Sequence, residues 1–68
     1  MKNKVIYSGL AAFHFTFNLM PYRIEFEGMQ PPFNVNIFKN NDYIETYRVL
    51  NAANKSNAKD ILLHFLNS

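Results

Sequence analysis

The sequence contains no cysteine and no tryptophan, and it has only two glycines. Without cysteine the chain forms no disulfide and offers no thiolate to a metal. Its two histidines, His14 and His64, are too few for a structural zinc site. No glycine-rich turn is present to build an oxyanion hole. These absences argue against a metal, a cofactor and an enzymatic activity.

The sequence also lacks a large excess of positive or negative charge. Seven basic and five acidic residues give a net charge of +2, and the basic residues are scattered along the chain. A nucleic-acid-binding domain usually gathers its lysines and arginines on one surface or in one run. An acidic DNA mimic would need a dense carboxylate surface to copy the phosphate repeat. Nucleic acid is therefore the weakest of the partners considered below.

A long hydrophobic run is missing too. Met1–Lys4 and the apolar stretch Val5–Phe13 have the outline of a signal peptide, but Ser8 and Gly9 interrupt it. A membrane-spanning helix needs about 20 apolar residues. We therefore expect no membrane span and a cytoplasmic chain, with a signal peptide as the alternative.

The 68 residues are 49% apolar and 16% aromatic, which predicts one folded domain over residues 1–68. A domain of this size buries only about 60% of the surface that its unfolded chain exposes. Small domains are usually stabilised by disulfides, metals or a partner chain. Since the first two are absent, we expect a homo-oligomer.

Two hairpins are predicted, of which the first comes from a clear period of two. Phe13–Leu19 and Tyr22–Phe26 alternate apolar and polar residues on both sides of Met20 and Pro21. A turn centred on Met20-Pro21 would pair Phe15 with Phe26 and His14 with Glu27. Proline fits the commonest two-residue turns poorly, so a longer turn and a shifted register stay open. Gly28–Pro32 is predicted to be an extended connector.

The second hairpin is predicted over Phe33–Phe38 and Tyr43–Leu50, with Asn40-Asn41 at the turn. A two- or four-residue loop would place Phe33, Val35 and Ile37 on one face with Ile44 and Thr46. The opposite face would then carry Phe38, Tyr43, Tyr47 and Val49, whereas a three-residue loop would exchange the faces of the second strand.

One C-terminal helix follows. Ala58, Ile61, Leu62, Phe65 and Leu66 form an apolar stripe at helical spacing. Asn54 or Ser56 is expected to cap it, and Asp60 to lie near the positive end of its dipole. The predicted fold is α+β, with an antiparallel sheet covered by this helix on the face of Phe15, Phe17, Ile24 and Phe26. A short extra strand at Val5–Tyr7, with a bend at Gly9, stays open.

Three sets of residues are candidates for function. Tyrosine and arginine are enriched at protein interfaces, and the predicted protein-binding surface consists of Phe38, Tyr43, Tyr47 and Arg48. A second set could bind the phosphate of a nucleotide, and it consists of Arg23, Arg48, Lys55 and Lys59. His14 opposite Glu27 is the nearest approach to a catalytic pair, but no nucleophile except Thr16 accompanies it. His64 is expected to interact with the helix dipole.

The leading hypothesis is a small non-enzymatic protein that binds and inhibits a host protein, such as a component of a defence system. Ten asparagines and abundant lysine, isoleucine and phenylalanine indicate an A/T-rich genome, which fits a bacteriophage or mobile element. The alternative is an oligomer that sequesters a nucleotide signal between its subunits. A nucleic-acid-binding domain is the weaker alternative.

Overall fold

The computed structural model describes residues 10–68. Four strands precede one helix: β1 (Leu10–Phe17), β2 (Met20–Glu27), β3 (Phe33–Lys39), β4 (Asp42–Val49) and α1 (Lys55–Leu66). The predicted α+β fold of two hairpins and a C-terminal helix is therefore confirmed. The strand expected at Val5–Tyr7, the bend at Gly9 and most of the signal-peptide-like stretch lie outside the described residues.

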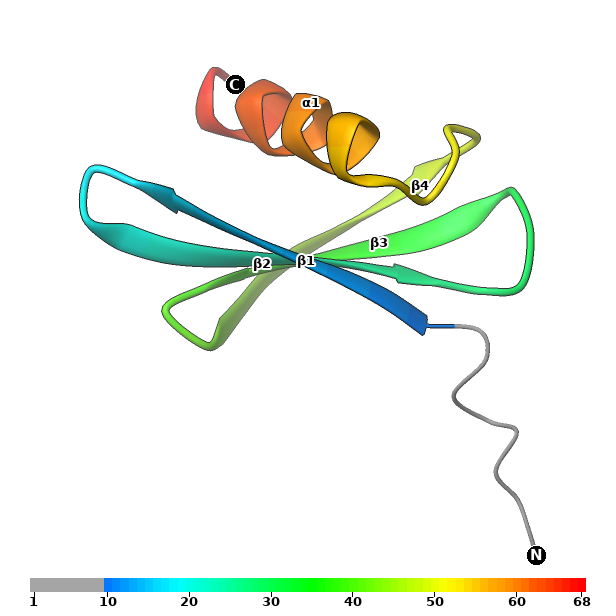
Figure 1. Cartoon of the computed structure of the whole chain (residues 1–68), viewed down its shortest axis with the longest axis horizontal. Coiled ribbons are helices and arrows are strands. Elements are labelled where there is room, and N and C mark those ends of the chain that lie inside the picture. The colour runs from blue at the N-terminus through cyan, green and yellow to red at the C-terminus, as the bar shows by residue number, and fades with distance from the viewer. Residues whose placement is uncertain (1–9) are drawn as a thin grey trace, which may run out of the picture.

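The strands form one antiparallel sheet in the order β1-β2-β3-β4, with α1 lying across one face (Figure 1). The core fills the space between the sheet and the helix. Inward-facing side chains of β2 and β3 meet three helix residues there, and the buried set is Tyr22, Ile24, Phe26, Phe33, Val35, Ile37, Ala58, Ile61 and Leu62. The second face carries no covering element among the described residues, and we call it the open face.

Phe26 lies at the centre of this core and is 1% exposed. Its ring makes edge-to-face contacts with Phe13 on β1, at 5.9 Å between centroids, and with Phe33 on β3, at 5.6 Å. Edge-to-face pairs of this kind stabilise by about 0.5–1.5 kcal/mol beyond the area they bury. The aromatic richness of the sequence is thus used to join β1, β2 and β3 through one side chain.

The turn of the first hairpin differs from the prediction. Asn18 and Leu19 form it with φ angles of 51° and 65°, and Phe17 pairs with Met20. A two-residue turn of this type needs positive φ at both positions, which proline cannot adopt. Pro21 instead lies in β2, where its carbonyl accepts a hydrogen bond from the amide of Asn40 at 2.8 Å.

The register of the first hairpin shifts with its turn. Phe15 pairs with Tyr22 instead of Phe26, and His14 pairs with Arg23 instead of Glu27. The shift covers an even number of residues, so every side chain keeps its predicted face. Leu19 is the exception, because it lies in the turn and is 95% exposed instead of facing the core.

The second hairpin turns at Asn40-Asn41 as predicted, with φ angles of 52° and 71° and with Lys39 opposite Asp42. The faces on which the side chains of β4 lie differ from the prediction for a two-residue loop. Phe38 pairs with Tyr43, but Ile37 pairs with Glu45, so Ile44 is an extra residue in β4. Such a β-bulge reverses the alternation of every later residue in the strand.

The bulge decides which side chains of β4 face the helix. Val35 pairs with Tyr47 and Phe33 with Val49, so Tyr47 and Val49 join the core face. The expectation that Ile44 and Thr46 share a face with Phe33, Val35 and Ile37 is wrong. Thr46 lies opposite Asn36 on the open face.

The connector between the hairpins, residues 28–32, follows a series of bends, so it is not the continuous extended segment that its two prolines predict. The peptide bond between Pro31 and Pro32 is cis. Gly28 begins it with a φ of 130°, a conformation that residues with a side chain rarely adopt. A Cβ atom at this position would lie 3.5 Å from the ring of Phe33.

Helix α1 is capped by Asn54, one of the two expected residues. The Oδ1 atom of Asn54 accepts a hydrogen bond from the amide of Asn57 at 2.9 Å. The side chain of Asn57 in turn donates to the carbonyl of Ala52 at 3.0 Å. Because the helix begins at Lys55, its first turn holds no acidic residue, and Asp60 lies beyond the turn where the dipole would favour it.

Candidate functional site

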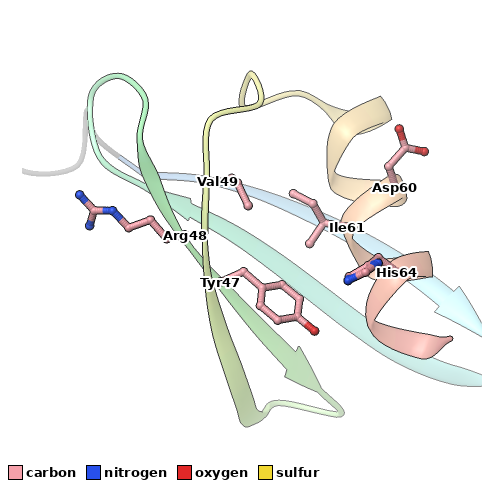
Figure 2. Close-up of a pocket in the computed structure, with 6 residues that line it drawn as sticks. All are labelled: Tyr47, Arg48, Val49, Asp60, Ile61 and His64. Carbon is pink, nitrogen blue, oxygen red and sulfur yellow. The ribbon is translucent and has the colours of Figure 1, made fainter. Parts of the chain in front are cut away.

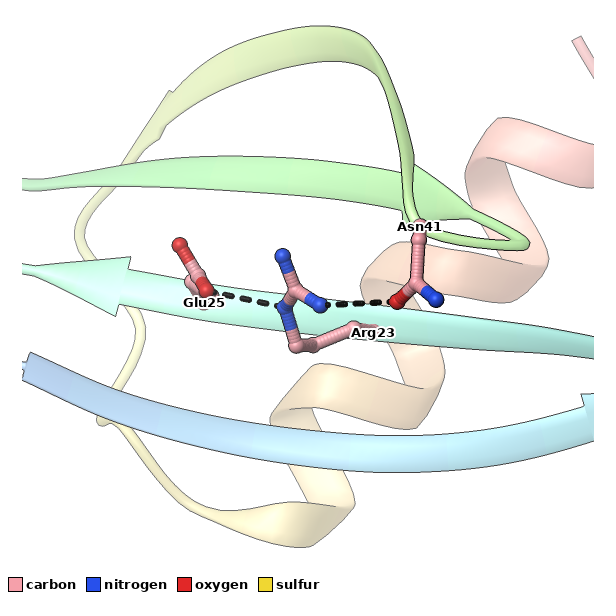
Figure 3. A network of polar contacts seen from close by, with 3 residues as sticks. All are labelled: Arg23, Glu25 and Asn41. Atoms are coloured by element: carbon pink, nitrogen blue, oxygen red, sulfur yellow. Dashed lines mark hydrogen bonds and ion pairs between the residues drawn. The ribbon is translucent and has the colours of Figure 1, made fainter.

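Arg23 is the centre of a polar network on the open face (Figure 3). Its Nε donates to Glu25 Oε2 at 2.9 Å, and its Nη1 donates to Asn41 Oδ1 at 3.2 Å. Figure 3 shows the three side chains in front of β2, with α1 behind the sheet. The network therefore lies on the side that the helix leaves uncovered.

The same guanidinium also contacts an aromatic ring. Its central carbon lies 4.0 Å from the ring centroid of Phe38, the cross-strand partner of Arg23 on β3. A cation over an aromatic face stabilises by about 0.5–1 kcal/mol at an exposed site. Two acceptors and one ring thus fix the orientation of Arg23.

An aromatic pair continues the network to the edge of the sheet. The ring of Phe38 makes an edge contact with Tyr43 at 5.8 Å between centroids. The hydroxyl of Tyr43 lies 2.6 Å from that of Thr46, which donates to Asn36 Oδ1 at 2.7 Å. Tyr43 is nevertheless 58% exposed, so most of its ring is accessible.

Arg48 is the second arginine of the open face. Its Nη1 donates to Oδ1 of its cross-strand partner Asn34 at 3.1 Å. The two arginines share this face with two carboxylates, since Glu25 and Glu27 alternate with the buried residues of β2. The formal charges of the four cancel, and the open face is polar and aromatic without being strongly basic.

The four residues of the predicted protein-binding surface are divided between the two faces. Phe38, Tyr43 and Arg48 lie on the open face, whereas Tyr47 points toward α1 (Figure 2). The bulge at Ile44 is the physical reason, because it inverts β4 between Tyr43 and Tyr47. Sequence periodicity missed the bulge. It also missed Arg23, Asn36 and Thr46 as members of the same surface.

Tyr47 belongs to a groove between β4 and α1. This groove has a volume of about 350 Å³ and is lined by Tyr47, Arg48, Val49, Asp60, Ile61 and His64 (Figure 2). The rings of Tyr47 and His64 lie 6.2 Å apart in an edge contact. Two causes raise the pKa of the Tyr47 phenol above its usual value of 10.0. The larger is partial burial, and the smaller is the nearby Glu45 carboxylate. The phenol therefore stays protonated near neutral pH.

The predicted phosphate-binding residues are also spread over two parts of the fold. Arg23 and Arg48 lie on the open face, and Lys55 and Lys59 lie in the first turns of α1, which covers the other face. A single chain does not gather the four into one site. Arg23 and Arg48, with Phe38 and Tyr43, are the part of this set that shares a surface.

His14 and His64 also have definite places. His14 lies on the exposed side of β1 opposite Arg23, so the pairing with Glu27 that suggested catalysis is wrong. His64 lies in the last turn of α1, where a histidine suits the negative end of the dipole.

In residues 10–68 no three histidine, aspartate or glutamate side chains are grouped as metal ligands. No helix in this range is long and apolar enough to cross a membrane.

Comparison with known proteins adds no relative. No protein-family model matches the chain, and neither a curated protein nor a solved structure matches it.

Proposed function

We propose that this chain is a small non-enzymatic binding protein that contacts another protein through the open face of its sheet. The contact surface consists of Arg23, Phe38, Tyr43 and Arg48. The observation that carries the proposal is the stacking of Arg23 on Phe38, continued by the exposed ring of Tyr43, on the face opposite the helix. Tyrosine and arginine are the residues most enriched among binding hot spots.

The fixed orientation of the Arg23 side chain on this surface supports binding. Arg23 is held by Glu25, Asn41 and Phe38, so its side chain has little rotamer freedom left to lose on association. Immobilising a flexible side chain at an interface costs about 0.5–1.5 kcal/mol, a cost that a surface ordered in advance avoids. A mixed arrangement of two arginines and two glutamates suits a protein partner better than a polyanion.

We further propose that a bacteriophage or mobile element encodes this chain, and that the chain inhibits a host protein in the cytoplasm. As a binding protein, the chain would act by occupying a surface of its partner. The A/T-biased residue composition supports such an origin. A defence-system component is the class of host protein that this origin favours.

The test is affinity capture with matched variants. The tagged wild-type chain is exposed to a lysate of the organism that encodes it, or of that organism's host, and bound proteins are identified by mass spectrometry. We expect one discrete protein that is lost with Tyr43→Ala or Arg48→Ala and is retained with Lys59→Ala on the exposed side of α1. A partner retained by both open-face variants would refute this surface.

A nucleotide is the second candidate, favoured by the presence of two arginines and two aromatic rings on one face. Arginine binds phosphate through paired N–H groups, and aromatic rings stack on bases. Ligand binding would raise the melting temperature in proportion to the logarithm of ligand concentration once the site is saturated. A melting temperature that stays constant across a panel of mono-, di- and cyclic nucleotides would refute this candidate.

A further inference from the structure

The outer edge of β1 is a second surface, separate from the open-face site. Strand β1 is the first in the sheet, and no other described element pairs with its outer side. In Figure 1 it is the foremost strand and is uncovered along its length. An edge strand presents a row of unpaired amides and carbonyls to which another strand can add.

The two edge strands of the sheet differ in their protection. Strand β4 carries Asp42, Glu45 and Arg48 and is interrupted by the bulge at Ile44. Charges and bulges are the usual means by which proteins keep edge strands from pairing. Strand β1 has the sequence LAAFHFTF and pairs regularly with β2 over all eight residues. It contains no lysine, arginine, aspartate, glutamate or proline.

The phenylalanines of β1 are incompletely covered. Phe13, Phe15 and Phe17 face the core but are only partly buried. By contrast, Ile24 and Tyr22, the β2 partners of Phe13 and Phe15, are buried. Leu10 is 49% exposed. A strand added to this edge would cover the aromatic side chains on the helix side, so apolar burial would accompany the backbone pairing.

The hydrogen-bond pattern of the first hairpin determines which backbone groups of β1 point away from β2. The turn at Asn18-Leu19 makes Phe17 and Met20 a hydrogen-bonded pair, and the antiparallel pattern alternates from there. The N–H and C=O groups of the odd-numbered residues of β1 therefore point to β2. Those of Leu10, Ala12, His14 and Thr16 point outward.

We propose that two copies of this chain pair through β1, antiparallel and about a two-fold axis at Phe13, to form a continuous eight-stranded sheet. Ala12 then lies opposite His14 of the second copy, and Leu10 opposite Thr16. This register uses all of residues 10–16 with the outward groups in hydrogen-bonding positions. Registers shifted by two residues in either direction pair only three of the four outward-pointing residues Leu10, Ala12, His14 and Thr16.

The side chains suit this register. On the helix face, Phe15 lies opposite Ala11 of the second copy, so a large residue meets a small one on each side of the central Phe13 pair. On the open face, the small Ala12 lies opposite the larger His14. No two charged side chains of like sign meet at the seam, which would destabilise it. Both helices lie on the same face of the extended sheet.

A second copy is favoured as the occupant over a different strand of the same protein. The β1–β1 contact is isologous and closes at two subunits. Pairing of β1 with β4 would be head-to-tail, would generate an open filament, and would meet the charges and the bulge of β4. The inference uses the edge of β1 only and does not depend on the partner of the open face.

The test uses sedimentation velocity on the full chain and variants at positions 12 and 14. We expect the wild type to sediment with twice the 8.0 kDa mass of the chain at high concentration. Ala12→Lys with His14→Lys places like charges opposite each other at two positions of the seam. It should raise the dimer dissociation constant roughly tenfold or more. Ala12→Lys with His14→Glu places opposite charges there and should restore the dimer.

Ile44→Lys, which adds the same charge to the other edge strand, is the matched control and should leave the dimer intact. Circular dichroism confirms that each variant is folded. As an independent measurement, the amides of Ala12 and His14 should exchange hydrogen more slowly in the wild type as its concentration rises.

Four results would overturn the proposal. They are a wild type that stays monomeric at every concentration, a double-lysine variant that is folded and still dimeric, a dimer lost with Ile44→Lys, or species that grow without limit. If the double-lysine variant does not fold, the concentration dependence of amide exchange at Ala12 and His14 decides, and its absence overturns the proposal.

Discussion

Val35 and Tyr47 are cross-strand partners on the face of the sheet that α1 covers. Tyr47 reaches that face only because Ile44 adds one residue to β4, while Tyr43 remains on the open face. The two tyrosines of one short strand therefore have different roles. One packs against the core and the ring of His64, and the other is exposed beside Phe38.

This division predicts unequal effects of two alanine substitutions. Tyr47→Ala removes part of the contact between β4 and α1 and should lower the free energy of unfolding by about 2 kcal/mol. This is less than the roughly 3–5 kcal/mol of a fully buried aromatic residue, because Tyr47 is only partly buried. Tyr43→Ala should lower it by less than about 1 kcal/mol. Urea unfolding monitored by circular dichroism measures both. Equal losses would contradict the facing of β4.

The stacking of Arg23 on Phe38 predicts an energetic coupling between the two side chains. A double-mutant cycle with Arg23→Met and Phe38→Leu should give a coupling free energy of about 0.5–1 kcal/mol. A matched cycle of Arg23→Met with Lys59→Met, on the helix, should give a value near zero. Coupling that is equally small in the two cycles would show that the contact contributes nothing measurable.

The positive φ of Leu19 predicts a stabilising substitution. The left-handed region costs a residue with a Cβ about 1–2 kcal/mol, and glycine lacks this cost. Glycine loses more conformational freedom on folding, so Leu19→Gly should raise the free energy of unfolding by about 0.5–1 kcal/mol. The side chain is 95% exposed, so no packing is lost.

Leu50→Gly is the matched control for that substitution. Leu50 is also largely exposed, but it is not among the described residues with positive φ. Glycine should therefore destabilise the chain there. If thermal unfolding shows the same sign for both substitutions, the turn conformation at Leu19 is wrong.

The cap of α1 predicts a loss of about 1 kcal/mol for Asn54→Ala, because the amide of Asn57 would lose its acceptor. Asn51→Ala, which changes the same residue type just before the helix, should stay within about 0.5 kcal/mol of the wild type. Chemical denaturation compares the two. A larger loss at Asn51 would place the start of the helix earlier than Lys55.

Much of the fold was predictable from local patterns. The alternation of Phe13, Phe15 and Phe17 assigned the faces of β1 correctly even though the turn was misplaced, because the register shift was even. Asn40-Asn41 marked its turn because asparagine tolerates positive φ. The helical stripe, through Ala58, Ile61 and Leu62, marked the covering helix.

The candidate site was predicted only in part. Phe38, Tyr43 and Arg48 were recognised as surface residues of the right type. Their association with Arg23 depends on the pairing of β2 with β3, which joins residues of separate hairpins. No pattern within either hairpin reports which strands become neighbours.

The sequence by itself determined the elements, the faces of the first hairpin and the apolar side of the helix, because these follow from the period of hydrophobic residues and from backbone preferences. Tertiary structure decided the turn at Asn18-Leu19, the bulge at Ile44 and therefore the separation of Tyr43 from Tyr47. The physical reason is that the bulge places Tyr47 and Val49 opposite Val35 and Phe33 on the core face, and such contacts join residues of different strands. The period of hydrophobic residues within one strand carries no information about contacts with other strands.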